Sequence, residues 1–179
     1  MRILAMVFFF VLVPFAAHAL DVDHCGQIVP DGETGDLVGD LTCTAGQDGI
    51  ALGDQATLRF AGHVLSGSGG STAVVCTTNR CTVLGPGEIV GGEWNGIVGN
   101  GAKGGRAILQ GLRIHGTTAA ISGFAKGRLT VADVTVDHNR TGLTAMGRAE
   151  LTDFTAHDNG NYGAHASSTL VGTNVVTID

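Results

Sequence analysis

Apolar residues alternate with small or polar residues in short runs along most of the chain. In the segment "RLTVADVTVDH", which spans 128–138, Leu129 and Val131 alternate with polar neighbours, and the alternation resumes at Val134 and Val136. A period of two residues is typical of β-strands with one buried face. Glycine occupies 29 of the 179 positions, which disfavours helices. The pattern therefore predicts an all-β chain of short strands.

The same shape returns along the sequence. The segments 56–67 ("ATLRFAGHVLSG"), 81–92 ("CTVLGPGEIVGG") and 106–117 ("RAILQGLRIHGT") align at an offset of 25 residues. This alignment matches Leu58 with Val83 and Ile108, Val64 with Ile89 and Ile114, and Gly67 with Gly92. A fixed period of this length over several copies is the signature of a repeat architecture.

Later copies are shorter and continue to the end of the chain. Leu109, Leu112 and Ile114 return as Val131, Val134 and Val136, and then as Leu151, Phe154 and Ala156, at offsets of 22 and 20 residues. A second short strand is expected after each turn, at "AAIS", "GLTA" and "GAHA". One copy cannot bury its apolar side alone. Stacked copies, with equivalent strands about 4.8 Å apart, form a parallel β-helix around one aliphatic interior.

Other repeat architectures fit the sequence less well. Leucine-rich repeats share the period, but their L-x-x-L-x-L-x-x-N pattern and helical segment are missing. A β-propeller needs about 40–50 residues for each blade. The G-G-x-G-x-D nonapeptide of calcium-binding repeats does not occur either. We therefore predict a single-domain parallel β-helix of six to seven coils, as estimated from the repeat period.

The N-terminal residues have the features of a secretory signal peptide. A basic residue, Arg2, precedes an apolar run, and the small residues "AHA" end at Ala19. A membrane anchor is the alternative, but the run is short and Pro14 interrupts it. No later stretch is apolar enough to span a membrane. We expect cleavage after Ala19 and a mature domain, 20–179, that is secreted or periplasmic.

Cysteine usage agrees with export. All four cysteines follow the expected signal peptide, and an even number in an exported chain suggests two disulfides. Three pairings are possible. We favour Cys25–Cys43 and Cys76–Cys81 because each closes a local loop. No C-x-x-C pair is present, so a zinc site is disfavoured and no metal is expected.

The first part of the mature chain resembles a known group of proteins. A Cys-Gly pair, a second cysteine, a "GI-L" strand and a "TL-F-GH-L-G" strand occur together at Cys25, Gly26, Cys43, Gly49, Ile50, Leu52, Thr57, Leu58, Phe60, Gly62, His63, Leu65 and Gly67. This is similar to the opening coil of secreted bacterial right-handed parallel β-helix proteins of the pectate-lyase-like superfamily. The resemblance implies a right-handed superhelix and an N-terminal cap held by Cys25–Cys43, and it leaves the activity open.

The charge and the C-terminal segment limit the partners. The net charge is -6, and the ten Lys and Arg residues are scattered singly along the sequence, which disfavours nucleic acid or an anionic membrane. The segment "VVTID" does not resemble a cap. We expect the strand edge there to meet further coils or to associate end to end with a second copy.

Two polar columns follow from the alignment. Asp133, Asp153 and Asn174 form one column, and Asn139 and Asn159 form the other. The simplest interpretation is a ladder at the turns, in which side chains bond the backbone and left-handed corners favour Asn. On distance alone, Asp133 and Asp153 also qualify as the two acids of a glycoside hydrolase.

A row of histidines and aspartates is the second group of candidates. His115, Asp137 and His157 align in successive copies, with His138 and Asp158 beside them. Imidazole beside carboxylate suits proton transfer near neutral pH, so His115, Asp137 and His157 are catalytic candidates. The alternative is that these positions are simply exposed and polar.

Trp94, the single tryptophan, lies in "GGEWNG" beside Glu93. We expect this segment to belong to the longest loop, 91–105. An exposed indole ring there could stack on a sugar, with Trp94 and Glu93 as substrate-binding residues. A buried ring would instead cover the edge of the core.

Recognised catalytic motifs are missing. The sequence has neither the paired aspartates nor the "GHG" of polygalacturonases, and no acidic trio accompanies Arg113, Arg128 or Arg148. Nucleophile elbow, P-loop and dinucleotide motifs are also absent, so no cofactor is expected. We expect interaction with a polysaccharide along a face of the solenoid. The alternatives are a non-catalytic structural or adhesive surface module, and a weak glycoside hydrolase or polysaccharide lyase.

Overall fold

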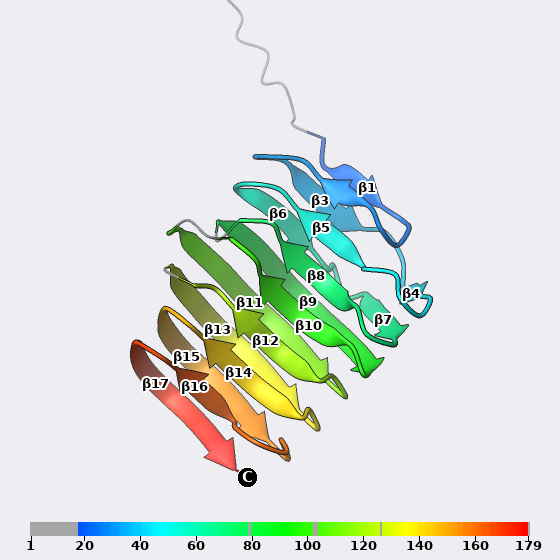
Figure 1. Ribbon diagram of the computed structural model, residues 1–179. Coiled ribbons are helices and arrows are strands. Elements are labelled where there is room, and N and C mark those ends of the chain that lie inside the picture. Colours follow the sequence, from blue (N-terminus) through cyan, green and yellow to red (C-terminus); the bar gives the residue numbers. More distant parts are fainter. Residues whose placement is uncertain (1–17, 79, 102–103, 126, 179) are drawn as a thin grey trace, which may run out of the picture.

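The computed structural model describes residues 18–178 except 79, 102–103 and 126. This part of the chain is a parallel β-solenoid of about seven turns without helices, which confirms the predicted fold class. Figure 1 shows the coils stacked from β1 (Leu20–Val22) at one end to β17 (Thr169–Ile178) at the other. No described helix is available to cross a membrane. Most of the expected signal peptide, residues 1–17, lies outside the described residues.

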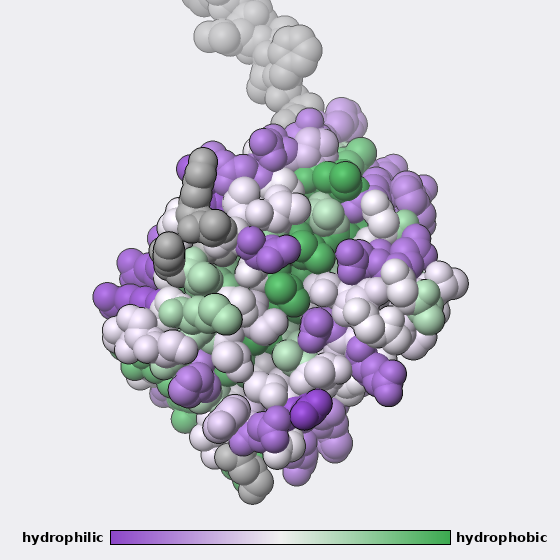
Figure 2. Space-filling view, in the orientation of Figure 1, coloured by the Kyte–Doolittle hydropathy of each residue, from purple (hydrophilic) through white to green (hydrophobic). Residues whose placement is uncertain are grey.

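One short strand from each coil contributes to a seven-stranded parallel sheet. Its outer face is apolar in the first coils and polar in the later ones, as one column of outward side chains shows. This column consists of Ile28, Ala51, Val75, Val98, Ser122, Thr144 and His165. Figure 2 shows hydrophobic side chains gathered in a band in the upper half of the view. The strands are β2 (Ile28–Val29), β5 (Ile50–Leu52), β8 (Thr72–Cys76), β10 (Asn95–Gly99), β12 (Ala119–Gly123), β14 (Thr141–Ala145) and β16 (Ala164–Ala166).

The rest of each coil belongs to a ten-stranded sheet. In the first coils it is formed by β1, β3 (Thr34–Leu37), β4 (Leu41–Cys43), β6 (Ala56–Arg59) and β7 (Val64–Ser68). In the later coils it is formed by long strands, which are β9 (Cys81–Gly92), β11 (Arg106–His115), β13 (Arg128–Asp137), β15 (Arg148–His157) and β17. Because β9 pairs with both β6 and β7, one long strand takes the place of two short ones.

Each of the last four long strands turns a corner at one residue with positive φ. In β13 the buried residues are Val131 before the corner and Val134 after it, so Asp133 is an extra residue between them. This extra residue shifts the alternation of buried and exposed positions by one, so that side chains from both halves of the strand point into the core. We call these halves the first and second limbs. The corner residues, with their φ angles, are Gly111 (68°), Asp133 (52°), Asp153 (49°) and Asn174 (52°).

The strand register corrects part of the sequence alignment. The expected partners were wrong by one residue at three places: the structure pairs Val83 with Leu109 instead of Ile108, Ile89 with Leu65 instead of Val64, and Gly67 with Gly91 instead of Gly92. Corners of neighbouring coils differ in length, so one offset cannot fit both limbs. Between β9 and β11, the residues 85–86 lie opposite Gly111. Between β7 and β9, the four residues 60–63 lie opposite the three residues 85–87. A slip of one residue turns Ile108 away from the core. From Leu109 onward the predicted columns are confirmed.

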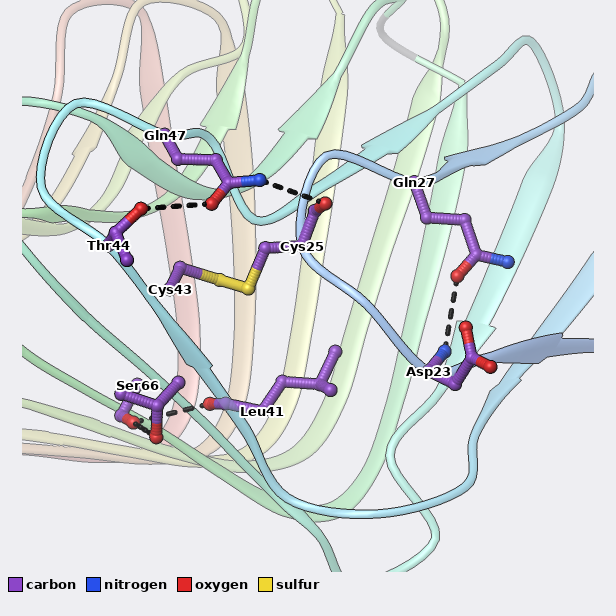
Figure 3. Close-up of a disulfide and its surroundings, with 9 residues drawn as sticks. Asp23, Cys25, Gln27, Leu41, Cys43, Thr44, Gln47 and Ser66 are labelled. Atoms are coloured by element: carbon purple, nitrogen blue, oxygen red, sulfur yellow. Dashed lines mark hydrogen bonds between the residues drawn. A yellow bond between two sulfur atoms is a disulfide. The ribbon is translucent and has the colours of Figure 1, made fainter.

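Both favoured disulfides are present. Cys25–Cys43 and Cys76–Cys81 are bonded, and no described cysteine is free. Figure 3 shows the first disulfide beside Gln47, whose side-chain amide donates a 3.0 Å hydrogen bond to the carbonyl oxygen of Cys25. Two disulfides are typical of a chain that folds in an oxidising, extracytoplasmic environment.

The last described coil has the most exposed apolar residues. Leu170, Val171, Val176 and Ile178 are 44%, 46%, 47% and 61% exposed, and β17 pairs only with β15 among the described strands. The expectation that further coils or a second copy cover this edge stays a prediction.

Candidate functional site

The predicted histidine row exists on the second limb of the ten-stranded sheet. His115 pairs with Asp137 across β11 and β13, and Asp137 pairs with His157 across β13 and β15. The residue before each of them, Ile114, Val136 or Ala156, is buried in the core. Because neighbours in a strand point to opposite faces, the three row residues point outward. The fold therefore stacks them as the alignment predicted.

Asp137 is the centre of this row. Its side chain points outward and is nevertheless 0% exposed, because neighbouring side chains cover it. Arg113 donates from Nε and Nη2 to the two carboxylate oxygens of Asp137, each at 3.0 Å. The Nδ1 atom of His138 lies 2.9 Å from Asp137 Oδ2. The bidentate contact fixes both the carboxylate and the guanidinium group in one orientation.

The ionisation of Asp137 follows from these contacts. Burial by itself raises the pKa of Asp137, but it is outweighed by hydrogen bonds from Arg113 and His138 and by the charges of Arg113 and His115. The resulting pKa is about 2. Asp137 is thus ionised at neutral pH and is not suited to act as a proton donor there. Its pairing with Asp137 also raises the pKa of Arg113.

Carboxylates flank the histidines on both sides. Glu88 Oε2, on β9, lies 3.6 Å from His115 Nε2, a buried atom without a hydrogen bond. On the other side, Asp158 Oδ2 lies 2.8 Å from His157 Nδ1 and 4.0 Å from His138 Nε2. The rings of His138 and His157 meet edge to face, with centroids 6.1 Å apart. The result is one network of alternating acidic and basic groups over four coils.

A shallow hollow of about 530 Å³ lies beside this network. Its lining combines apolar and charged side chains, which are Gly62, Val64, Pro86, Gly87, Glu88, Gly111, Leu112, Arg113, Asp133 and Thr135. Glu88 is 42% exposed, and its nearest contact with Arg113, 3.9 Å, is longer than a hydrogen bond. Oxygens of Glu88 are thus available to accept hydrogen bonds from a ligand.

The two aspartates of the acid-pair hypothesis occupy corners. Asp133 and Asp153 lie at equivalent corners of adjacent strands, whose backbones are about 4.8 Å apart. Asp133 lines the hollow, whereas Asp153 accepts a 2.8 Å hydrogen bond from Asn174 Nδ2. Their positive φ angles confirm that this column forms left-handed corners. A catalytic role for Asp133 and Asp153 stays a prediction.

The second polar column is a buried ladder. Asn139 Nδ2 donates to Asn159 Oδ1 at 3.1 Å and to the Ile114 carbonyl at 3.0 Å. Asn139 Oδ1 accepts hydrogen bonds from the Thr117 backbone amide and hydroxyl, at 2.9 and 2.8 Å. Asn159 Nδ2 continues the pattern to the Val136 carbonyl at 3.1 Å. The predicted ladder is thus confirmed, and its role is to satisfy buried backbone groups.

Of the two positions expected for Trp94, the structure shows the buried one. Its side chain is 0% exposed and belongs to the core, so its ring has no face available to stack on a sugar. The space comes from Gly67, where a β-carbon would lie 2.4 Å from the indole ring. The expected long loop was also wrong, because β9 ends at Gly92 and β10 begins at Asn95. Glu93 is exposed at a corner with φ 57°.

Two features of the network, Glu88 and the pairing of Arg113 with Asp137, were not among the sequence-based predictions. The register places Glu88 directly opposite Arg113 on the neighbouring strand. On the other neighbouring strand, β13, the residue opposite Arg113 is Thr135, and Asp137 follows it by two positions. The offset of 25 residues already places Glu88 opposite Arg113, so this pair could have been found from the sequence. The contact between Arg113 and Asp137 could not, because the register partner of Arg113 is Thr135.

Neither protein-family models, nor curated proteins, nor solved structures show a match to this chain.

Proposed function

We propose that this protein is a secreted polysaccharide-binding module that holds a glycan in the hollow on the second limb. The hollow combines an apolar floor from Val64, Pro86 and Leu112 with charged groups from Glu88 and Arg113. Sugar rings have apolar C–H faces and hydroxyl edges, which such a lining complements. This juxtaposition is the observation that carries the proposal.

Rigidity of the charged groups supports the same conclusion. Arg113 is held by two hydrogen bonds to buried Asp137, so it loses little side-chain entropy when a ligand binds. Glu88 and Arg113 can together accept and donate hydrogen bonds to neighbouring hydroxyl groups. Secretion and membership of the pectate-lyase-like superfamily belong to this proposal. The parallel solenoid and the Cys25–Cys43 disulfide support both.

The test is affinity electrophoresis of the mature chain through gels that contain neutral polysaccharides, with mannan, xylan and laminarin as probes. We expect retardation by at least one of them. Glu88→Gln should reduce the retardation because it removes the charged acceptor while it keeps the shape of the side chain.

Glu93→Gln is the matched control, since it removes the same charge from an exposed corner outside the hollow. Its retardation should equal that of the wild type. Retardation that Glu88→Gln leaves unchanged, or a loss with Glu93→Gln alone, would reject the hollow as the site. No retardation in any gel would favour a structural or adhesive module instead.

A further inference from the structure

Four arginines that are dispersed in the sequence form a row on the first limb. Arg106, Arg128 and Arg148 are direct partners in the register of β11, β13 and β15. Arg80 extends the row by one coil. Thr82 and Ile108 are register partners, and Arg80 and Arg106 each precede their own member of this pair by two residues. Neighbouring coils are about 4.8 Å apart. The side chains of Arg80, Arg128 and Arg148 are 51%, 50% and 52% exposed.

Protein carboxylates neutralise only part of this row. Asp54 pairs with Arg80. Glu150 bridges two coils: its Oε2 accepts from Arg128, and its Oε1 lies 2.7 Å from Arg148 Nη2. Within the part of the chain that the structure describes, exposed Arg106 has no carboxylate partner. The row therefore has two contacting carboxylates for four guanidinium groups. Arg106 carries one of the two uncompensated positive charges, and Arg128 and Arg148, which share Glu150, carry the other.

A second hollow lies at this position. It has a volume of about 360 Å³ and is lined by Gln55, Arg80, Cys81, Thr82 and Arg106. Two guanidinium groups thus border one concavity, together with the Thr82 hydroxyl and the Gln55 amide. Every one of these polar groups can donate a hydrogen bond, and none of the lining residues is acidic. The hollow is complementary to an anion.

We propose that the hollow between Arg80 and Arg106 binds the sulfate ester groups of a linear anionic polysaccharide. Glu150 shows the mode of contact, because it accepts hydrogen bonds from arginines of two adjacent coils. A sulfate ester has three terminal oxygens, so one group can reach Arg106 and the remaining N–H groups of Arg80. A linear polymer fits a row that runs along the solenoid axis, and this site is separate from the hollow lined by Glu88.

Binding of dextran sulfate to the mature chain, measured by isothermal titration calorimetry at low and high salt, tests the proposal. Polygalacturonate and uncharged dextran are the comparison probes. We expect dextran sulfate to bind more tightly than polygalacturonate, dextran not to bind, and binding to weaken with salt. Arg106→Gln should weaken binding about tenfold or more, since it removes charge-assisted hydrogen bonds.

Two further variants separate this site from general charge effects. Arg140→Gln removes the same charge from an exposed position off the row and should bind like the wild type. Glu150→Gln should bind severalfold more tightly, because it releases Arg128 and Arg148 from their shared carboxylate. Equal losses in Arg106→Gln and Arg140→Gln, preference for polygalacturonate, or no binding of dextran sulfate would overturn the proposal. The neutral polysaccharides test the hollow beside Glu88, and dextran sulfate tests the hollow between Arg80 and Arg106. Either proposal can therefore be rejected while the other stands.

Discussion

Successive coils are held together differently at the two ends of the solenoid. In the region 20–77 the strands have two to five residues, and the disulfide joins Cys25, in a turn, to Cys43, at the end of β4. In the region 106–178 the long strands have ten residues in constant register, and their turns are joined by the buried side chains of Asn139 and Asn159. Irregular coils are thus cross-linked covalently, and regular coils are joined by amide hydrogen bonds. Aspartates in the first coils, such as Asp40 and Asp48, also accept hydrogen bonds from the backbone of the next coil, but these contacts are exposed, whereas the amide ladder is buried.

The strongest test of this comparison removes the ladder. Asn139→Ala leaves the buried Thr117 amide and the Ile114 carbonyl without their partners, so we expect a loss of about 3–4 kcal/mol in the free energy of unfolding. Urea unfolding followed by circular dichroism measures it. Asn161→Ala, at an exposed turn nearby, should change stability by less than about 0.5 kcal/mol. Similar values for both variants would show that the ladder does not join the coils.

Removal of the first disulfide should have a slightly smaller effect. Replacing Cys25 and Cys43 with serine releases a loop with a sequence separation of 18, which corresponds to about 3 kcal/mol of loop-closure entropy. The Cys76–Cys81 pair has a separation of only 5, so its removal should cost about 2 kcal/mol. The measurement is urea unfolding of the two double variants. A reversed order would mean that strain or packing, instead of chain entropy, dominates.

The charge network should have the smallest effect, and that effect depends on pH. The pKa of Asp137 is about 2 in the folded chain and lies below its ordinary value of 3.8. Its ionised form therefore stabilises the fold fully above pH about 4 and loses this effect as the pH falls towards 2. Asp137→Asn should cost about 2 kcal/mol at pH 7 and about 1 kcal/mol at pH 3.

Asp133→Asn provides the control for this measurement, because Asp133 is exposed on the same strand and asparagine tolerates its left-handed corner. Its unfolding free energy should match that of the wild type at both pH values. A loss from Asp137→Asn that is the same at pH 7 and pH 3 would contradict the proposed pairing with Arg113.

Much of the fold was predictable from local pattern. The alternation around Val131 and Val134, the repeat period and the polar corners determine parallel coils, because each coil repeats the same choice between buried and exposed positions. Register was predicted correctly where the corners have constant length, as in the Asp133 column. The predicted register was wrong where neighbouring corners differ in length, at 60–63, 85–87 and Gly111, since a local pattern does not show how many residues a corner contains.

The candidate sites depended more on tertiary structure. Sequence spacing predicted that His115, Asp137 and His157 align, but only the fold shows that Asp137 is buried beneath Arg113 and its neighbours. The sequence also allowed both an exposed and a buried ring for Trp94. The ring is buried in the core because Gly67, which has no side chain, leaves space for it. The sequence by itself determined the solenoid and its columns, because these follow from periodicity. Tertiary structure alone decided which charges meet and which stay exposed, because the lateral stacking of coils brings together residues that are far apart in the chain.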